Sequence, residues 1–433
     1  MTTTSIQTRT TPQEGNMQRT KTRQTMAFMA TAVTGSLVLA ACGGAGGPSS
    51  AGGKVSDDKV VIGLLNDQSG VYKDLSGPNS KVAIQMAIDD YKAKYGDKAV
   101  AKDIEIVAAD HQNKPDVANT KAQEMYDRDK ADIILDVPTS SAALAVATQA
   151  KAKKKLFIDI GAGSTALTGK SCNKYTFHWA YDTAMLARGT GSAVVEGGGK
   201  NWSIVYPDYA FGQDMTKSFT ASVKGAGGTV QQSIATPFPN ENFATFITKA
   251  ASSKPDVVGI MAAGGDLVNF VKQYNQAGMQ DKAQLAVGLM FITDIHSLGV
   301  DAFKNTTFTD AWYWNFDAQN KAWADKFKAK TNTRPSFAHA GNYSAAFNYL
   351  EAIQASGTDN SDTIVKQLEG KKINDMFLRN GEVRAADHNV IHDSYLVKVK
   401  SKDQVKEEWD YEEVVKTIPA ADAYGPASPD CKM

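Results

Sequence analysis

Residues 60–95 read VVIGLLNDQSGVYKDLSGPNSKVAIQMAIDDYKAKY, and this stretch decides the fold class. Its apolar start, 60–65, predicts a buried strand, and the polar loop 66–79 that follows contains two glycines. The remainder carries apolar residues at helical spacing, which predicts an amphipathic helix. This is the first unit of an open α/β sheet, where ligands bind outside the carboxyl ends of the strands. We therefore expect the loop to contribute to a binding site.

The same alternation of strand and helix continues along the chain. Three further strands are predicted at 104–109, 133–137 and 156–160. The four strands are separated by predicted helices at 78–95, 115–128 and 141–153. Such repeats indicate a parallel sheet covered by helices on both faces. The stretch 175–181, YTFHWAY, is interpreted as a strand that leaves this lobe.

A second α/β series begins at residue 183, with predicted strands at 202–206, 229–235, 256–261 and 285–288. After residue 308 the chain is mostly helical and ends in a hairpin-like pair of strands, 381–383 and 394–399. Too few strands remain for a third domain, so we expect two doubly wound lobes, several crossings between them and a central ligand cleft. The expected division is 58–181 with 313–385 for lobe 1, 182–312 with 386–420 for lobe 2, and 421–433 as a tail.

The N-terminal 41 residues are interpreted as a secretory signal. Three basic residues precede an apolar stretch, 26–39, which is too short for a permanent membrane span. Met17 is a candidate for the true start. The ending Leu-Ala-Ala-Cys resembles the lipobox of bacterial lipoproteins, which implies a lipid on Cys42 and an extracytoplasmic protein held at the membrane. An ordinary signal cut near Ala41 is the alternative, and residues 42–57 read as the lipidated cysteine and a flexible tether.

Composition restricts the classes of partner. The 433 residues include 47 basic and 47 acidic side chains, without a basic stripe, so nucleic acid is not an expected partner. In an oxidising compartment Cys172 and Cys431 are expected to form a disulfide, although two separate buried thiols remain an alternative. The sequence has no Cys-x-x-Cys pair and no Cys/His cluster, so neither a metal nor a cofactor is expected.

Two loops at predicted strand ends are candidates for anion binding. Residues 161–166, GAGSTA, lack the features of a dinucleotide site and are interpreted as exposed backbone amides suited to a carboxylate. Thr139 and Ser140 precede a predicted helix, where a hydroxyl could cap the helix or help to form an anion site. Several aromatic residues at other strand ends either pack in the core or form walls of the cleft. They are Tyr72, Tyr209, Phe211, Trp312, Tyr313 and Trp314.

Six segments together resemble a known family. They are VIGLLNDQSGVYKDLSGP, ADHQNKPDVA, DVPTSSAALAVA, LTGKSCNKYTFHWAYDT, DYAFGQDM and DVVGIMAAGGDLVNFVKQ. They resemble the substrate-binding lipoproteins of ABC importers in the branched-chain amino acid class, the type I periplasmic binding proteins, over about 59–420. The segments 66–70 and 311–314 resemble most the subgroup associated with aromatic carboxylates. The resemblance implies a monomer that delivers its ligand to a permease and ATPase complex.

The resemblance also implies which residues bind the ligand. The carboxylate would be held by the loops that contain Thr139 and Ser140, and Gly161, Ala162, Gly163 and Ser164. The walls would comprise Tyr72, Leu75, Phe211, Ala263, Asp266, Phe291 and Trp314. Amino-acid-binding members keep an acid for the ammonium group near position 290 or 291, which is apolar here, although Asp266 or Asp294 could replace it.

Three functions were weighed from the sequence. The first is capture of a small organic acid, either an aromatic carboxylate or a hydrophobic amino acid, without covalent chemistry. The second is a ligand sensor of the same fold, which would need a separate signalling protein. The third is a secreted hydrolase that uses Ser140 or Ser164, which lacks a recognisable base. We expect a binding protein rather than an enzyme.

Overall fold

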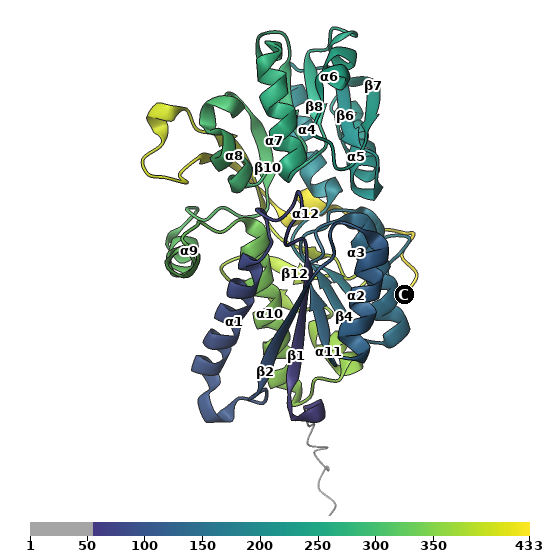
Figure 1. The fold of residues 1–433 in the computed structure, drawn as a ribbon, viewed down its shortest axis with the longest axis vertical. Coiled ribbons are helices and arrows are strands. Elements are labelled where there is room, and N and C mark those ends of the chain that lie inside the picture. Colours follow the sequence, from purple (N-terminus) through teal and green to yellow (C-terminus); the bar gives the residue numbers. More distant parts are fainter. Residues whose placement is uncertain (1–54) are drawn as a thin grey trace, which may run out of the picture. The chain divides into compact units, whose positions relative to one another are not determined.

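The computed structural model describes residues 55–433, so the predicted signal, Cys42 and most of the tether lie outside the described residues. The first lobe contains a parallel sheet in the order β2-β1-β3-β4-β5 (Figure 1). Its strands are β1 (Val60–Asn66), β2 (Ile104–Asp110), β3 (Ile133–Leu135), β4 (Leu156–Asp159) and β5 (Thr176–His178). The stretch at 175–181 was expected to leave the lobe, but its strand β5 pairs with β4 and completes this sheet.

Helices cover both faces of this sheet, as the alternation of apolar side chains predicts. On β1, Val60, Ile62 and Leu64 pack into one core and Val61 and Leu65 into another, because successive strand residues point to opposite faces. The first core includes α1 (Asn79–Tyr95), α10 (Phe337–Ser356) and α11 (Ser361–Leu368). The second includes α2 (Pro115–Asp127) and α3 (Ser140–Lys153), which lie across the sheet from α1 and α10 in Figure 1.

The second lobe repeats this construction with a parallel sheet in the order β7-β6-β8-β9. Its strands are β6 (Asn201–Pro207), β7 (Thr229–Thr236), β8 (Val257–Ile260) and β9 (Gln284–Val287). The helices α4 (Thr183–Glu196) and α5 (Ala210–Gly225) pack on one face, and α6 (Ala244–Ala251) and α7 (Gly264–Gln276) on the other. A short helix that the sequence did not indicate, α8 (Ile292–Leu298), follows β9. The expected fold class, two doubly wound α/β lobes, is confirmed.

The later part of the chain divides between the two lobes. A separate antiparallel sheet is formed by β10 (Thr307–Asp310), β14 (Ser394–Val399) and β15 (Glu412–Ile418), and it packs beside α4. The chain then enters α9 (Ala318–Thr331), which packs against α1 together with α10. It returns through the small sheet β11 (Lys372–Ile373), β12 (Gly381–Val383) and β13 (Val390–Ile391).

Two details of this part differ from the sequence interpretation. The strands at 381–383 and 394–399 do not form a hairpin, because β12 pairs with β11 and β13 whereas β14 pairs with β10 and β15. Asn389 forms a bridge to His178 of β5, and residues up to 391 pair with strands of the first lobe. The chain therefore crosses to the second lobe after residue 391, whereas the sequence interpretation placed this crossing after residue 385. The chain thus crosses between the lobes three times, after β5, after β10 and after β13.

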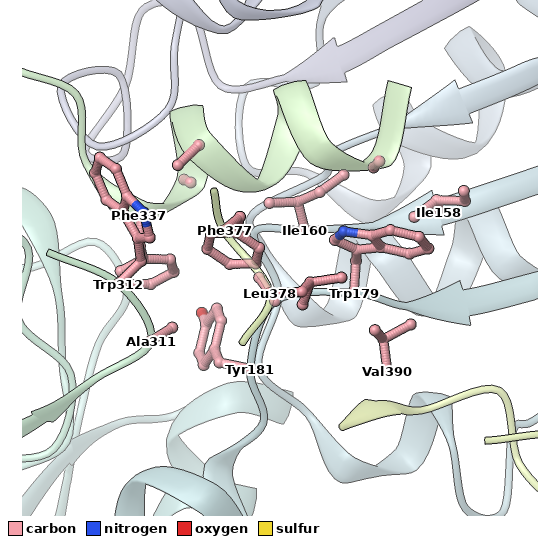
Figure 2. Packing of buried hydrophobic residues seen from close by; sticks show 14 of the residues in the cluster. Ile158, Ile160, Trp179, Tyr181, Ala311, Trp312, Phe337, Phe377, Leu378 and Val390 are labelled. Atoms are coloured by element: carbon pink, nitrogen blue, oxygen red, sulfur yellow. The ribbon is translucent and has the colours of Figure 1, made fainter. Parts of the chain in front are cut away.

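One apolar core joins the crossings to both lobes. Figure 2 shows its central part, in which Ile158 and Ile160 of the first sheet approach Trp179, and Tyr181, Ala311 and Trp312 come from two crossings. The indole nitrogen of Trp179 donates to Ser344 Oγ at 3.2 Å, and that of Trp312 donates to the carbonyl oxygen of Met376 at 2.8 Å. The polar atoms of these two buried indoles therefore have partners.

The C-terminal segment is tied to the first lobe. Cys172 and Cys431 form a disulfide, with Cα atoms 5.5 Å apart and a sequence separation of 259. The helix α12 (Ala420–Tyr424) packs against α4. Within 55–433, no helix combines the length and the apolar character needed to cross a bilayer.

Candidate functional site

A cavity lies where the carboxyl ends of both parallel sheets meet. Its walls come from loops after β1, β3 and β4 of the first lobe and after β6, β8 and β9 of the second, together with the first crossing. The lining residues are Tyr72, Leu75, Pro138, Gly161, Tyr181, Tyr209, Phe211, Ala263, Leu289 and Phe291. In both sheets the strand order reverses beside the first strand, which is the place where open α/β sheets bind ligands. The loop predicted from 66–79 thus forms one wall of the cavity.

The cavity is narrow. The space outside the atoms is about 220 Å³, even with the open solvent at its mouth included. Sites for drug-sized molecules usually have about 300–1,000 Å³. The walls therefore lie almost in contact, and a ligand would need to be small or to separate the lobes when it enters.

Five of the ten lining residues are aromatic, and further aromatic rings pack behind them. The rings of Phe291 and Phe337 stack with centroids 4.4 Å apart, and Phe337 meets Tyr181 edge to face at 5.1 Å. At another side of the cavity, Phe238 stacks on Tyr209 at 4.2 Å. No charged side chain lines the cavity. These walls suit an apolar, planar body of a ligand.

The first loop is fixed by polar side chains at the end of β1. Asn66 Nδ2 donates to the carbonyl oxygen of Gly77 at 2.7 Å, which closes the base of the loop. Asp67 accepts the backbone N–H of Gly70 at 2.7 Å and of Tyr72 at 2.8 Å. Asn66 and Asp67 therefore hold Tyr72 in position, while the tyrosine itself faces the cavity.

The loop after β3 brings a helix N-terminus to the cavity. Pro138 lines the cavity and α3 begins two residues later, at Ser140. Neither candidate hydroxyl caps this helix: Thr139 Oγ1 donates to Asn113 Oδ1 instead, and Ser140 Oγ is fully buried without a hydrogen-bond partner. The first backbone N–H groups of a helix have no partner within it, so the start of α3 can accept an anion.

The same loop has an unusual backbone. Asp136 and Val137 have φ angles of +77° and +80°, a region that a β-branched residue rarely adopts. Burial raises the pKa of Asp136 to about 6, although Asn66 and other side chains donate hydrogen bonds to it. Conformational strain of this kind is often found at ligand sites. Here it sets the direction in which Pro138 and the start of α3 face the cavity.

Two glycines let backbone and side chains approach closely in the loop after β4. A Cβ atom on Gly161 would lie 2.7 Å from both Asp136 Oδ1 and the Cα of Pro138. One on Gly163 would lie 2.8 Å from the ring of Tyr181 and 3.2 Å from the ring of Phe211. Tyr181 also donates its hydroxyl to the carbonyl oxygen of Gly161 at 2.7 Å. The loop therefore packs directly against two walls of the cavity.

The two acids that could have received an ammonium group are engaged elsewhere. Asp266 accepts the backbone N–H of Asn240 at 3.1 Å, and Asp294 accepts that of Phe291 at 3.0 Å. Burial raises the pKa of both carboxyls to about 7. Neither side chain lines the cavity. A ligand ammonium would thus find no carboxylate on the walls.

Several hydrogen bonds join the lobes beside the cavity. Tyr72 and Tyr209 share a hydrogen bond between their hydroxyls at 2.6 Å. The N–H of Gly265 donates to the carbonyl oxygen of Val71 at 3.0 Å. Further along, the carboxylate of Asp214 accepts the backbone N–H of Thr165 at 2.7 Å and its hydroxyl at 2.9 Å. Each of these contacts joins a residue of the first lobe to one of the second.

A buried pair of acids lies at the second crossing. Asp310 ends β10 and Glu412 begins β15, and both side chains are buried. Burial raises the pKa of both carboxyls, and the nearby charge of Asp310 adds to the rise for Glu412. Among the described residues, no group forms a hydrogen bond with either carboxyl oxygen of Glu412. Two carboxylates buried together would repel each other, so the folded pair keeps one proton between them to a higher pH than free carboxyls do.

The predicted binding residues divide into two groups. Those that line the cavity are Tyr72, Leu75, Gly161, Phe211, Ala263 and Phe291. Those that do not are Thr139, Ser140, Ala162, Gly163, Ser164, Asp266 and Trp314. Trp314 instead lies under the guanidinium of Arg334, 3.8 Å from its ring centre, and donates to the carbonyl oxygen of Trp409.

Four lining residues were not among the predicted binding residues, namely Pro138, Tyr181, Tyr209 and Leu289. Tyr209 had been noted only as an aromatic residue at a strand end. Tyr181 was assigned to a strand, although its place at a crossing between the lobes is typical of a cleft residue. Pro138 and Leu289 carry no chemical signal in the sequence.

The hydroxyls considered as nucleophiles have no base beside them. Ser164 Oγ accepts the N–H of Ala166 at 3.3 Å, and Ser140 Oγ has no hydrogen-bond partner. Neither serine is hydrogen-bonded to a histidine in the part of the chain that the structure describes. Over the same residues, no cluster of three or more histidine, cysteine or acidic side chains could hold a metal ion.

Comparisons with known proteins agree with this geometry. Residues 59–404 match a family described as periplasmic binding protein. The chain belongs to this family. The resemblance seen in the sequence is thereby confirmed, and membership places the protein outside the cytoplasm.

Several relatives support the assignment. A periplasmic binding protein from Burkholderia mallei is 43% identical, with a TM-score of 0.81 over 85% of this chain and 96% of that chain. A branched-chain amino acid ABC transporter periplasmic ligand-binding protein from Burkholderia xenovorans is 32% identical, with a TM-score of 0.75 over 85% and 97%. An ABC transporter solute-binding protein from R. palustris, solved with benzoate, shares the fold at 22% identity, with a TM-score of 0.74 over 87% and 100%.

A curated relative matches over a shorter stretch. Leu/Ile/Val-binding protein homolog 4 of Brucella melitensis is 22% identical over 267 residues, which are 59% of this chain. The match spans 63% of the relative's length, which is less than two thirds.

Proposed function

We propose that this protein binds a small carboxylic acid with an apolar, preferably aromatic body outside the cytoplasm and delivers it to the permease and ATPase of an ABC importer. The observation that carries this proposal is the cavity, which has aromatic walls from both lobes and no charged lining residue. Delivery to an ABC importer is supported by the 32% identical relative that is described as part of such a transporter. Attachment through a lipid on Cys42 and action as a monomer belong to the same proposal.

The carboxylate of the ligand would bind at the start of α3. The helix has 14 residues, its first N–H groups are available to an anion, and the buried hydroxyl of Ser140 lacks a partner. Pro138, one of the two residues before the helix, already lines the cavity. The loop from Gly161 to Ser164 follows the neighbouring strand and would provide the second side of this anion site. A carboxylate here would satisfy the Ser140 hydroxyl.

The missing countercharge favours an acid without an ammonium group. A zwitterionic amino acid would bury its ammonium against aromatic walls, while Asp266 and Asp294 already accept backbone N–H groups. Burying an unpaired charge is costly. Benzoate in the R. palustris relative is consistent with this preference. We therefore place aromatic monocarboxylates ahead of leucine and its analogues.

Calorimetry and thermal-shift measurements on the protein without its signal would test the proposal. The protein is unfolded and refolded to remove any bound ligand and then titrated with benzoate, 4-hydroxybenzoate, phenylalanine and leucine. We expect binding of the aromatic acids, and a loss of about 10- to 150-fold in affinity in Phe211→Ala, because a buried ring contributes about 1.5–3 kcal/mol. Phe246→Ala, which removes a half-buried ring on α6 away from the cavity, is the matched control.

The outcomes separate the ligand class from the function. If leucine binds and no aromatic acid does, the ligand class is wrong but the binding function stands. If no small acid or amino acid binds or stabilises the protein, the proposed function itself is refuted.

A further inference from the structure

The hydroxyls of Tyr72 and Tyr209 form a polar spot in an otherwise apolar cavity. Tyr72 comes from the loop after β1 and Tyr209 from the loop after β6, so the pair joins the two lobes. Tyr72 is 3% exposed, and Phe238 covers both rings, with centroids 4.2 Å from Tyr209 and 5.7 Å from Tyr72. Tyr72 is therefore almost closed to water, whereas Tyr209 is half-buried.

The hydrogen-bonding capacity of this pair is not exhausted. Two phenolic hydroxyls offer two O–H donors, and their mutual bond at 2.6 Å uses one of them. Within residues 55–433, no other side chain or backbone group forms a hydrogen bond with either hydroxyl. One O–H donor of the pair consequently has no protein acceptor within this range, and both tyrosines line the cavity. A ligand oxygen placed here would accept that donor and gain affinity.

The charge around the pair selects the kind of oxygen. Asp266 lies close enough for its negative charge to contribute to the raised pKa of both tyrosines, after the larger effect of burial. A ligand carboxylate would be repelled here, whereas the start of α3 attracts it. The two ends of the cavity therefore differ: one accepts an anion and the other accepts a neutral polar group.

We propose that Tyr72 and Tyr209 form the subsite for a neutral oxygen of the ligand, such as a phenolic hydroxyl, at the end of an aromatic acid that lies away from its carboxylate. This inference rests on the proposed function, since it assumes that an aromatic acid occupies the cavity. It adds that hydroxylated aromatic acids are preferred over their unsubstituted or methylated counterparts. Because the subsite is shared between the lobes, the same contact also favours the conformation in which the lobes touch.

The experiment compares ligands that differ in one group. The affinities of benzoate, 4-methylbenzoate and 4-hydroxybenzoate are measured by calorimetry, together with 3-phenylpropanoate and 3-(4-hydroxyphenyl)propanoate for a longer body. The wild-type protein should prefer each hydroxylated acid about tenfold, as expected for one buried hydrogen bond. In Tyr209→Phe and in Tyr72→Phe the preference should fall below about twofold. Tyr206→Phe, which removes a half-buried hydroxyl of β6 outside the cavity, should keep it.

Each outcome has one meaning. Binding of the aromatic acids with equal affinity for hydroxylated and unsubstituted members refutes the subsite and leaves the proposed function standing. A preference that persists in both tyrosine variants also refutes the subsite, because the hydroxyl then binds elsewhere. If none of the five acids binds, the proposed ligand class fails, and the subsite fails with it. Circular dichroism of both variants shows that they are folded, and two separate substitutions protect the test against the failure of one.

Discussion

Replacing Gly163 with alanine should weaken ligand binding strongly without affecting the rest of the fold. The new Cβ would lie 2.8 Å from the ring of Tyr181 and 3.2 Å from the ring of Phe211, while ordinary contacts begin at 3.4 Å. Tyr181 would therefore have to move by about 0.6 Å in a tightly packed wall. Overpacking of this kind costs about 1–3 kcal/mol, which corresponds to a loss of about 5- to 150-fold in affinity.

Part of the loss should fall on the conformation that binds the ligand. The clash with Phe211 exists only when the lobes touch, because Gly163 belongs to the first lobe and Phe211 to the second, whereas the clash with Tyr181 arises at the first crossing. Gly225→Ala is the matched control, since a Cβ at that position meets nothing within 4 Å. Calorimetric titration with the tightest aromatic acid measures the effect. Unchanged affinity in Gly163→Ala, or an equal loss in Gly225→Ala, would refute the cavity geometry described above.

Three further substitutions test the crossings, the inter-lobe contact and the disulfide. In Glu412→Gln the buried pair with Asp310 can no longer share a proton. The free energy of unfolding, measured in urea between pH 5 and 8, should therefore fall less steeply with pH in the variant than in the wild type. The two slopes should differ by up to about 1.4 kcal/mol per pH unit. Asp214→Ala removes the hydrogen bonds from Thr165 and should lower ligand affinity about tenfold in calorimetry, because charge-assisted bonds contribute about 1.5–3 kcal/mol. Cys431→Ser opens a loop of 259 residues and should lower the free energy of unfolding by about 2–5 kcal/mol.

The sign of the pH effect follows from the raised pKa of the pair. Above about pH 4 the unfolded carboxyls lose their protons, whereas the folded pair retains one until the pH exceeds its raised pKa. The stability from this proton is complete at low pH and disappears as the pH rises. Glu413→Gln, an exposed neighbour, should keep the wild-type slope. A wild-type slope in Glu412→Gln would contradict the shared proton.

The other two predictions have equally direct controls. Asp208→Ala removes an exposed aspartate that bonds only within the second lobe, and its affinity should not change. An affinity in Asp214→Ala equal to that of the wild type would show that the contact with Thr165 does not help the lobes to close. For Cys431→Ser, a reducing agent should lower the stability of the wild-type protein to that of the variant.

The periodicity of the sequence was sufficient for the two lobes but not for the strand partners after residue 308. Apolar runs bounded by turns locate β1 and β6 well, because a strand buried on both faces needs such a run. The alternation of apolar and polar residues also identifies β12 and β14 as strands, but it does not show with which strands they pair. Their partners are decided by where each crossing returns the chain. This is why a hairpin was expected where the structure has two separate sheets.

The site was predictable to the extent that it depends on strand ends. Tyr72 and Phe211 follow the first strand of each lobe, and topology alone directs attention to them. Leu289 and Pro138 are found only once both sheets are placed. The role of Thr139 could not be predicted from its residue type. A threonine at this position suits a helix cap, but its hydroxyl donates to the side chain of Asn113 from another loop. Local propensity is overruled there by tertiary contact.

The narrow cavity and the contacts between the lobes together explain how residues outside the cavity can tune affinity. The hydrogen bonds of Tyr72 with Tyr209 and of Asp214 with Thr165 join protein groups only, so part of the energy that joins the lobes is intrinsic to the protein. A ligand shifts the equilibrium only through its greater affinity for the conformation in which the lobes touch. Apparent affinity is therefore the product of cavity contacts and the population of that conformation. Phe211→Ala changes the first factor and Asp214→Ala the second, so their effects on binding should add in the double variant.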